Sequence, residues 1–524
     1  MKKKLLLITS LFSIGLCFSQ TYGSYEIDTN GKIFYQLPNA IPSVPQENNI
    51  GPMALALDWS NPDFDVSNNP TKDSWDSRMA VGNTGNVYVV YSDNYTNGLQ
   101  KIMFRKKVVG ENWSTPIFVD KGGEIGGKNN HFGAITSSPN GDLHVIYNVW
   151  ANENVRNYIG YSYYNAATDI WSDGLKISDL GGTVNHSISH HDLYSTEDNL
   201  PVVVWGYDNR ENQVDEEVYM KYFDGTNWSS DIAVSDLTDN LGAGFPYIKS
   251  IGNNKAMLVY AEGTGGSMEI HYKIYDETTH TLSAAKVVTT ANVLSSSYVL
   301  TTSPTGEVMV LTIRKAVGPS RDVLNVYDYD SGSDSFSLSS NVFEVAANAG
   351  GLLKRIDWDC NAEGDCAVIY TDFLAQTNSF LEYNPTTGFG SPLVINEENP
   401  GLDAPNARFD PNGNLHVVWS DFRFNDGQGF DEREIIYEKG VNTNLGINAP
   451  SPTSISVFPN PSNGTFTIDT NETFTLEIFD VLGKKLDTKI ITSTTQINSN
   501  LASGTYFLRF TNAQATQVRK LLVE

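Results

Sequence analysis

The sequence predicts an all-β protein, a seven-bladed β-propeller followed by a small Ig-like β-sandwich. The first observation is a repeated turn: PNGDLHVIY at residues 139–147 returns as PNGNLHVVW at 411–419. A polar turn with a glycine followed by an alternating β-branched and aromatic run is typical of a hairpin leading into a half-buried strand. Looser copies lie at Gly85, Gly306 and Gly364, and degenerate ones at 198–202 and 253–257. The copies recur roughly every 50–58 residues, the length of a four-stranded blade, so seven copies predict seven blades.

A second repeat, out of phase with the first, marks the start of each outermost strand. It reads Trp-Ser at Trp113, Trp171 and Trp228, and its later copies begin at Leu282, Phe336 and Phe389. The unit with Gly413 lacks such an anchor, whereas a spare one stands at Trp59, ahead of the first unit. We therefore expect residues 57–66 to complete the last blade, because an unclosed ring would leave unpaired strand edges.

Residues 1–20 predict a cleaved secretory signal. Three lysines precede an apolar core that ends at Phe18, and this core is too short for a membrane span. Leu16 precedes Cys17, where a lipoprotein site needs a small residue. No other segment is apolar enough to cross a bilayer. The expected destination is therefore the outer-membrane surface or the medium.

The composition argues against nucleic acid and anionic membranes as partners. The formal charge is -26 and charged residues make up 18% of the chain. Both kinds of partner need a basic surface that displaces counterions. Solubility explains most of the acidic surface.

Two cysteines remain after removal of the signal. Cys360 and Cys366 flank one of the glycine turns, so they are expected to face each other across a hairpin. In an oxidising compartment this placement predicts a disulfide within one blade. No zinc-type spacing occurs in the sequence.

The pattern changes after residue 440, where the predicted propeller (residues 21–440) ends. Residues 441–453 form a polar linker with prolines, and residues 454–524 contain short alternating strands typical of a small β-sandwich. The landmarks of this last region are residues 457–461, Gly464, Phe466, residues 478–480, 483–484 and 501–507, and Lys520. With these landmarks the region resembles the C-terminal sorting domain of the type IX secretion system. The resemblance implies export with that machinery as partner and removal of the domain; the alternative is an ordinary Ig-like appendage.

A candidate site is predicted on the innermost strands, nine or ten residues ahead of each turn. That column contains Asp76, His131, His190, Arg355 and Asp403, with Arg78, His186 and Arg408 close by. Since each buried ion must be paired or hydrated, so many charges predict a polar pocket at one mouth of the channel. His131, His190 and Arg355 are the candidate catalytic residues. The candidate ligand-binding residues of this group are Asp76, Arg78, His186 and Arg408. The alternative is a set of ion pairs between blades, such as Asp76 with Arg355.

Long polar loops between second and third strands are expected at the same mouth. They carry Trp150 and Arg210 as further candidate ligand-binding residues. Aromatic faces beside arginines suit sugars with carboxylate or sulfate groups, through stacking and bidentate pairing. Such loops also occur in propellers that bind only protein.

Two known propeller families can be compared with this sequence. The Ser-x-Asp-x-Gly-x-Thr-Trp turns of sialidases are absent, which disfavours a sialidase. The stretch 130–147 is similar to a blade of the BNR-like propellers that include ulvan-type polysaccharide lyases, with His131 at the strand entrance. Where that family has a second catalytic histidine, this chain has Trp150.

No cofactor is expected. Residues 328–334 are similar to a calcium loop, but they fall where every blade has a hairpin turn, so a turn is favoured over structural calcium.

The sequence thus predicts a secreted or surface-displayed propeller that binds or cleaves extracellular acidic polysaccharide. A cleaving version would resemble a polysaccharide lyase or glycoside hydrolase, with a histidine removing a proton beside a uronate carboxylate and an arginine offsetting the charge. The alternative is a non-catalytic adhesion or scaffold propeller that recognises protein.

Overall fold

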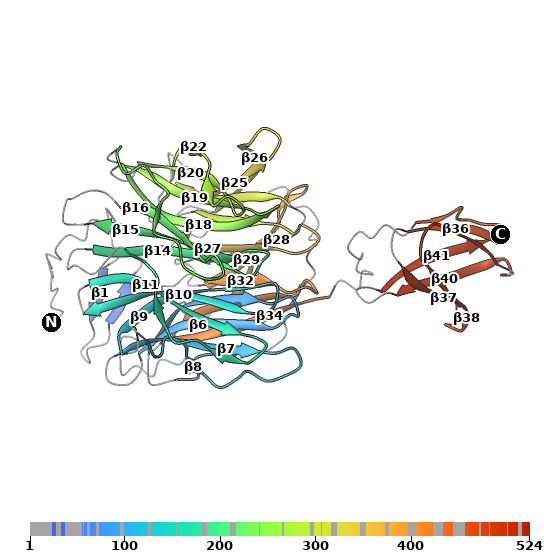
Figure 1. The fold of residues 1–524 in the computed structure, drawn as a ribbon, viewed down its shortest axis with the longest axis horizontal. Coiled ribbons are helices and arrows are strands. Elements are labelled where there is room, and N and C mark those ends of the chain that lie inside the picture. The colour runs from blue at the N-terminus through green and yellow to red at the C-terminus, as the bar shows by residue number, and fades with distance from the viewer. Residues whose placement is uncertain are drawn as a thin grey trace. The chain divides into compact units, whose positions relative to one another are not determined.

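A computed structural model provides the fold (Figure 1). It describes residues 24–27, 33–36, 55–443 and 456–524, apart from 56, 60–62, 70–72, 95–98, 124, 126, 153–154, 180–185, 210–215, 240, 265–266, 294–297, 305, 316–321, 346–352, 373–376, 397–404, 423–432, 471–472, 482, 500 and 512–515. All regular elements among these residues are β-strands. The chain divides into two compact units, Met1–Thr443 and Asn444–Glu524.

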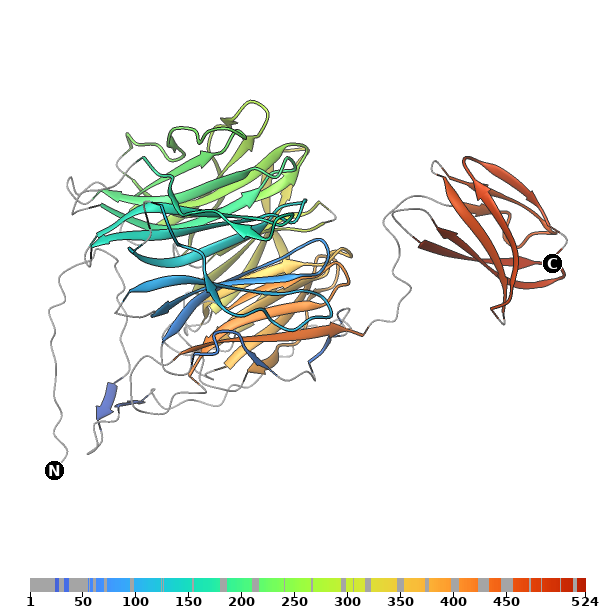
Figure 2. The ribbon, with the colours of Figure 1, turned by 60° about the horizontal axis from the view of Figure 1, so that its bottom comes forward.

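Besides a two-stranded sheet, the first unit contains antiparallel sheets of four or five strands. In all but the last of them the strands follow chain order from an innermost strand to the outer edge (Figure 2). The first sheet consists of β5 (Ser74–Val81), β6 (Val87–Asn94), β7 (Gln100–Lys107) and β8 (Ile117–Phe118). The second consists of β9 (Asn129–Ser137), β10 (Leu143–Asn152), β11 (Val155–Asn165), β12 (Ile170–Trp171) and β13 (Leu175–Lys176). The third consists of β14 (His186–Ser195), β15 (Pro201–Asn209), β16 (Glu217–Tyr222) and β17 (Ile232–Ala233).

The next sheets repeat this order. The fourth consists of β18 (Gly242–Gly252), β19 (Lys255–Thr264), β20 (Ser267–Asp276), β21 (Thr281–Leu282) and β22 (Lys286–Val293). The fifth consists of β23 (Tyr298–Thr302), β24 (Val308–Lys315), β25 (Asp322–Asp330) and β26 (Ser335–Val345). The sixth consists of β27 (Leu353–Cys360), β28 (Cys366–Asp372), β29 (Thr377–Asn384), β30 (Gly388–Phe389) and β31 (Leu393–Asn396).

The seventh sheet combines strands from both ends of the unit. It consists of β32 (Asn406–Phe409), β33 (Leu415–Asp421), β34 (Glu434–Asn442), β3 (Leu57–Asp58) and β4 (Phe64–Asp65). Leu57 pairs with Asn442, and Phe64 pairs with Tyr437. Residues that precede the first complete sheet therefore supply the outer edge of the last one.

Alternate side chains along a strand pack against the two neighbouring sheets. In β6, Val87 and Val89 belong to a core shared with the seventh sheet, whereas Tyr88 and Val90 belong to a core shared with the second. Successive side chains point to opposite faces of a strand, so a strand covered on both faces is apolar throughout. Among the described residues, every two consecutive sheets share such a core, and the seventh shares one with the first. The first unit is therefore all-β, with propeller-like sheets.

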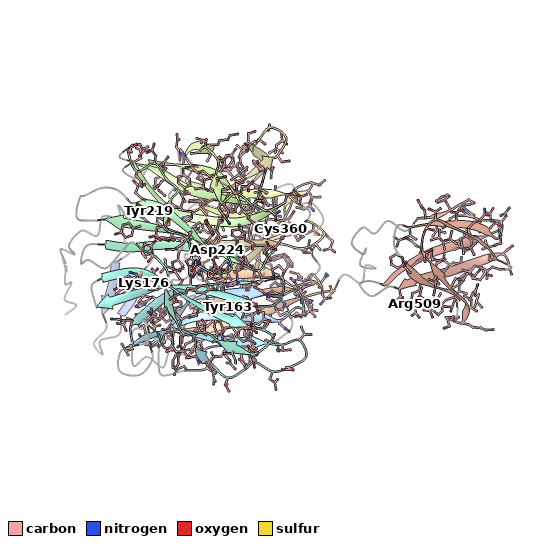
Figure 3. All side chains as sticks on the ribbon, in the orientation of Figure 1. Tyr163, Lys176, Tyr219, Asp224, Cys360 and Arg509 are labelled. Carbon is pink, nitrogen blue, oxygen red and sulfur yellow. A yellow bond between two sulfur atoms is a disulfide. The ribbon has the colours of Figure 1, made fainter. Side chains whose placement is uncertain are left out.

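The second unit contains two sheets on one core. One consists of β35 (Ser456–Phe458), β36 (Thr465–Asp469) and β39 (Thr495–Asn498), and the other of β38 (Lys485–Ile491), β37 (Phe474–Asp480), β40 (Gly504–Thr511) and β41 (Thr516–Val523). Phe466 from the first sheet and Leu476 and Phe510 from the second are buried together. On the opposite face, Arg509 (Figure 3) pairs with Glu477.

Two further observations complete the fold. β1 (Ser24–Ile27) and β2 (Ile33–Gln36) form a two-stranded sheet. The described residues contain no helix long and apolar enough to span a membrane. The predicted signal, residues 1–20, lies outside the described residues.

Candidate functional site

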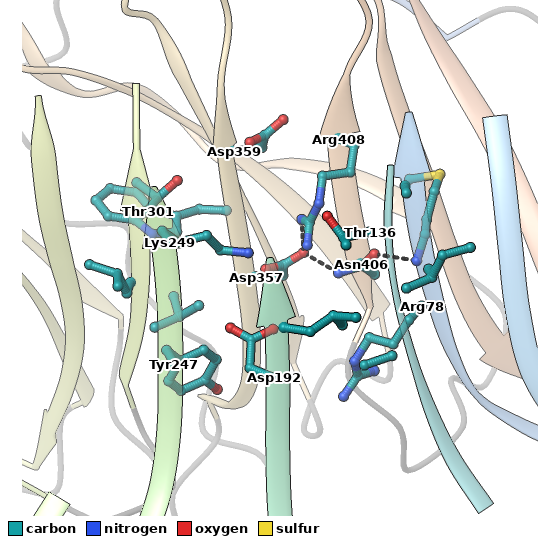
Figure 4. Close-up of a pocket in the computed structure, with 18 of the residues that line it drawn as sticks. Arg78, Thr136, Asp192, Tyr247, Lys249, Thr301, Asp357, Asp359, Asn406 and Arg408 are labelled. Atoms are coloured by element: carbon teal, nitrogen blue, oxygen red, sulfur yellow. Dashed lines mark hydrogen bonds and ion pairs between the residues drawn. The ribbon is translucent and has the colours of Figure 1, made fainter. Parts of the chain in front are cut away.

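The innermost strands surround a polar cavity of about 250 Å³. Each of β5, β9, β14, β18, β23, β27 and β32 contributes side chains to its wall (Figure 4). The charged side chains of the wall are Arg78, Asp192, Lys249, Asp357, Asp359 and Arg408.

Two positions on the inner strands supply these charges. One lies seven residues ahead of the positive-φ residue of the following turn, and the other lies five residues ahead. The first position holds Arg78, Asp192, Asp357 and Asn406, and the second holds Lys249, Asp359 and Arg408. Because alternate residues of a strand share a face, both positions project into the same space.

Asp357 connects the sixth sheet to the seventh. Its Oδ2 accepts hydrogen bonds from Arg408 Nη1 at 2.6 Å and from Ala407 N at 3.0 Å, and a third from the Asn406 side chain. Asn406 Oδ1 in turn accepts from Met79 N at 2.8 Å, which extends the connection to the first sheet (Figure 4). These contacts satisfy buried polar groups and fix three neighbouring inner strands.

Asp192 makes the equivalent connection between the third and fourth sheets. Its Oδ2 accepts a hydrogen bond from Ile248 N at 3.0 Å. The side chain at this strand position therefore binds the backbone of the next inner strand in three places around the cavity: Asp192, Asp357 and Asn406.

The cavity keeps Arg408 charged. Burial disfavours its cation, but the carboxylates of Asp357 and Asp359 outweigh burial and raise the pKa of Arg408 above its ordinary value. Burial raises the pKa of Asp359, whose Oδ2 accepts a hydrogen bond from Phe409 N at 2.7 Å. An opposite charge at short range favours the ionised form of Arg408 even where water is scarce.

Lys249 and His190 differ from the ion-paired arginines of the cavity wall. Lys249 projects into the cavity from β18 (Figure 4) and, unlike Arg78 and Arg408, has no carboxylate within ion-pair distance among the described residues. Burial, with the charges of His191 and Arg78, lowers the pKa of His190 to about 3. Its imidazole is therefore neutral near pH 7, and it packs 5.0 Å from the Tyr247 ring.

The structure brings some predicted site residues together. Arg78, His190 and Arg408 line the same cavity. Asp76 is buried beside it and forms an ion pair with Arg78 at 3.4 Å. Asp76 has a φ of 52°, a left-handed conformation within a bulge between Trp75 and Arg78.

His131 occupies a different environment. It is 5% exposed, and its ring lies 4.4 Å from that of Trp150 and 6.0 Å from that of Trp75. His131 is ten residues ahead of its turn and His190 is nine, and a shift of one residue moves a side chain to the other face of a strand. Among the described residues, the cavity wall does not include His131.

Four predicted residues are not placed in the site by the structure. His186 belongs to β14 and Arg355 to β27, but nothing beyond their backbone is described. Arg210 and Asp403 lie outside the described residues. Six further residues of the cavity wall were not predicted from the sequence: Asp192, Tyr247, Lys249, Asp357, Asp359 and Asn406. All six stand seven or five residues ahead of the positive-φ residue of the following turn, rather than the nine or ten used in the prediction.

Cys360 and Cys366 are joined by a disulfide (Figure 3). They pair directly at the end of β27 and the start of β28, and both are buried.

The segment similar to a calcium loop connects β25 to β26. Asp330 accepts hydrogen bonds from Gly332 N and Ser333 Oγ, and Asp334 accepts from Tyr329 Oη and pairs with Lys286. Among the described residues, no group of three or more His, Cys, Asp or Glu is arranged to hold a metal ion.

Several solved structures resemble the chain. An intramolecular trans-sialidase from Ruminococcus gnavus is 10% identical, with a TM-score of 0.40 over 74% of this chain and 98% of that one. An α-L-arabinofuranosidase of Fusarium graminearum is 10% identical, with a TM-score of 0.43 over 72% and 96%. A fungal alcohol oxidase in complex with copper is 13% identical, with a TM-score of 0.45 over 89% and 100%. These values are too low to transfer an activity. No curated protein sequence matches the chain.

The second unit has a family match. Residues 456–524 match the secretion system C-terminal sorting domain. This span covers β35 to β41, including the apolar core they share. The chain therefore carries a type IX sorting domain and is exported by that system to the cell surface or the extracellular space.

Proposed function

We propose that the first unit is a closed seven-bladed β-propeller whose central cavity binds one charged unit of an extracellular acidic polysaccharide. The second unit would be an Ig-like sandwich that directs export. The observation that carries the proposal is the polar cavity surrounded by the inner strands. Ligand sites in proteins are concave and combine apolar walls with a few convergent polar groups.

The size and charges of the cavity favour a small anionic group. Its volume of about 250 Å³ lies below the roughly 300–1,000 Å³ of drug-sized ligand sites, which suits one sugar ring better than several. Arg78 and Arg408 are paired with carboxylates, whereas Lys249 is available to a ligand. An ammonium group without an ion-pair partner gains most from an incoming carboxylate or sulfate.

Binding of purified full-length protein to uronate-containing and sulfated polysaccharides tests this proposal by calorimetry. Lys249→Ala should raise Kd about tenfold or more, because a hydrogen bond to a charged group contributes roughly 1.5–3 kcal/mol. Lys255→Ala, an exposed lysine at the start of β19, is the matched control and should leave Kd unchanged. Equal binding by wild type and Lys249→Ala would contradict the proposed site.

A cleaving function would depend on His190. Its imidazole is neutral near pH 7, which leaves a ring nitrogen to act as proton acceptor, although the lowered pKa makes it a weak base. Release of unsaturated sugars by wild type, lost in His190→Ala with Kd unchanged, would identify a lyase. Binding with no product would identify a binding module.

Paired charges favour a second candidate, a scaffold that recognises protein. Arg408 pairs with Asp357 between two inner strands, and Arg78 pairs with Asp76 within one strand, so these charges neutralise one another. If no polysaccharide binds and these pairs serve only stability, the recognition surface lies elsewhere on the propeller.

A further inference from the structure

A buried lysine, aspartate and asparagine meet between the first and second sheets, away from the cavity. Lys101 is 6% exposed, and Asp120 and Asn130 are 0% exposed. Lys101 is the second residue of β7, Asn130 is the second residue of β9, and Asp120 follows β8. Their neighbours Ile102 and Val119 belong to the apolar core shared by these sheets.

The lysine and asparagine nitrogens share two acceptors. Lys101 Nζ lies 3.5 Å from Asp120 Oδ2 and donates to Lys128 O at 3.2 Å. Asn130 Nδ2 donates to the same Asp120 Oδ2 at 2.5 Å and to the same Lys128 O at 3.4 Å. Two groups held on the same pair of oxygens are close neighbours, and their strands are also joined by Gln100 N donating to Asn129 Oδ1 at 3.1 Å.

We propose that Lys101 and Asn130 form an isopeptide cross-link between Nζ and Cγ, with Asp120 as the general acid and base. The amine attacks the carboxamide carbon, a C–N bond to Lys101 forms, and the C–N bond to Nδ2 breaks. Asp120 accepts the proton from Nζ and delivers it to the departing Nδ2, which leaves as ammonia. Atoms and electrons balance without any other reactant.

The surroundings favour the reactive protonation states. Burial raises the pKa of Asp120, although the charge of Lys101 and the hydrogen bond from Asn130 oppose this effect. A carboxyl with a raised pKa holds a proton more readily, which suits a group that takes a proton from the attacking nitrogen and gives it to the departing one. Fixed neighbours also replace a bimolecular encounter by an intramolecular one, which lowers the barrier.

The cross-link would fasten the first sheet to the second. It joins β7 to β9 across the connection that contains Asp120 and Lys128. Unlike the disulfide at Cys360, it would survive reducing conditions.

Tandem mass spectrometry of tryptic peptides from the purified, reduced full-length protein tests for the Lys101–Asn130 cross-link. Cleavage after Lys101 should fail, and residues 79–105 should appear joined to residues 129–156. The joined species should weigh about 17 Da less than the two peptides together, because one ammonia is lost. The measurement uses peptides rather than the intact protein, because a glutamine at a new N-terminus can also lose ammonia, and the two losses have the same mass.

Variants and an internal control accompany this measurement. Asp120→Asn and Lys101→Arg should each yield separate peptides. Lys221, also buried and paired with Asp231 at 3.0 Å, should be cleaved normally because its partners, Asp179 and Asp231, are carboxylates rather than amides. Separate peptides from the wild type would overturn the proposal, as would a loss of about 18 Da from a Lys101–Asp120 link. A link that persists in Asp120→Asn would overturn the role of Asp120.

Discussion

At the scale of single residues, Asp357 accepts three hydrogen bonds in the cavity wall. Asp357→Ala removes the acceptor for Arg408, Asn406 and Ala407 at once. We expect the free energy of unfolding to fall by about 3–5 kcal/mol, because a largely buried guanidinium is left without its carboxylate. Chemical denaturation measures the change, with the exposed Glu111→Ala as control. A loss no larger than that of the control would show that the pair is dispensable.

Glu434 makes stability depend on pH. It is 1% exposed, Ser67 Oγ donates to it, and burial raises its pKa from 4.5 to about 7, with Asp65 and Asp93 adding to the shift. Between these two values the unfolded chain releases this proton while the folded chain retains it, so this residue lowers stability as pH rises through that window.

Glu434→Gln should remove this contribution. At pH 4, below both pKa values, the variant and wild type should have similar free energies of unfolding, whereas at pH 8 the variant should be more stable by about 3 kcal/mol, the equivalent of the shift. Denaturation at both pH values, with Glu111→Gln as control, measures the difference. A variant that is less stable at pH 8 would show that the carboxylate is favoured there.

Site residues were harder to predict than their strands. The count from the turn placed Arg78, His190 and Arg408 near one another, and the structure places all three in the cavity wall. The same count could not decide which face His131 occupies, because bulges break the register ahead of the turns. Asp192 and Asp357 were missed because their hydrogen bonds join strands of different sheets, and these contacts are not visible in a local pattern.

At the scale of elements, the turns were the reliable signal. The turn residues Gly85, Gly141, Gly364 and Gly413 all have positive φ, the conformation that glycine adopts without steric cost. The sequence also predicted the partner of the N-terminal strand, because Trp59 has the outer-strand motif but precedes the first glycine turn, whereas the unit with Gly413 lacks that motif. The described strand pairing sets β3 beside β34.

The disulfide should stabilise the sixth sheet modestly. Cys360 and Cys366 are six residues apart, so the bond closes a small loop, and the chain-entropy estimate for such a loop is about 2 kcal/mol. In the double variant Cys360→Ser, Cys366→Ser the free energy of unfolding should fall by about that amount. Chemical denaturation compares the variant with wild type, with and without reductant. If reduced wild type is as stable as oxidised wild type, the bond does not contribute.

At the scale of the whole molecule, the two units have separate tasks. Deletion of residues 454–524 should block release from the periplasm while the first unit stays folded, because each unit has its own core. Cell fractionation locates the protein, and protease resistance of the retained protein reports its fold, with the full-length chain as control. Normal secretion of the truncated chain would contradict the sorting assignment.

The strands that join both ends of the first unit also set an order in time. Ser67 and Glu434 touch although 367 positions separate them, and Val66 N donates to Ile435 O beside them. A chain threaded N-terminus first through a narrow translocation channel delivers β4 long before β34. The seventh sheet therefore stays incomplete until nearly the whole unit has emerged, and closing so long a loop carries an entropy cost that no early contact offsets. Completion of the seventh sheet, and with it the link between the two ends of the first unit, therefore follows threading.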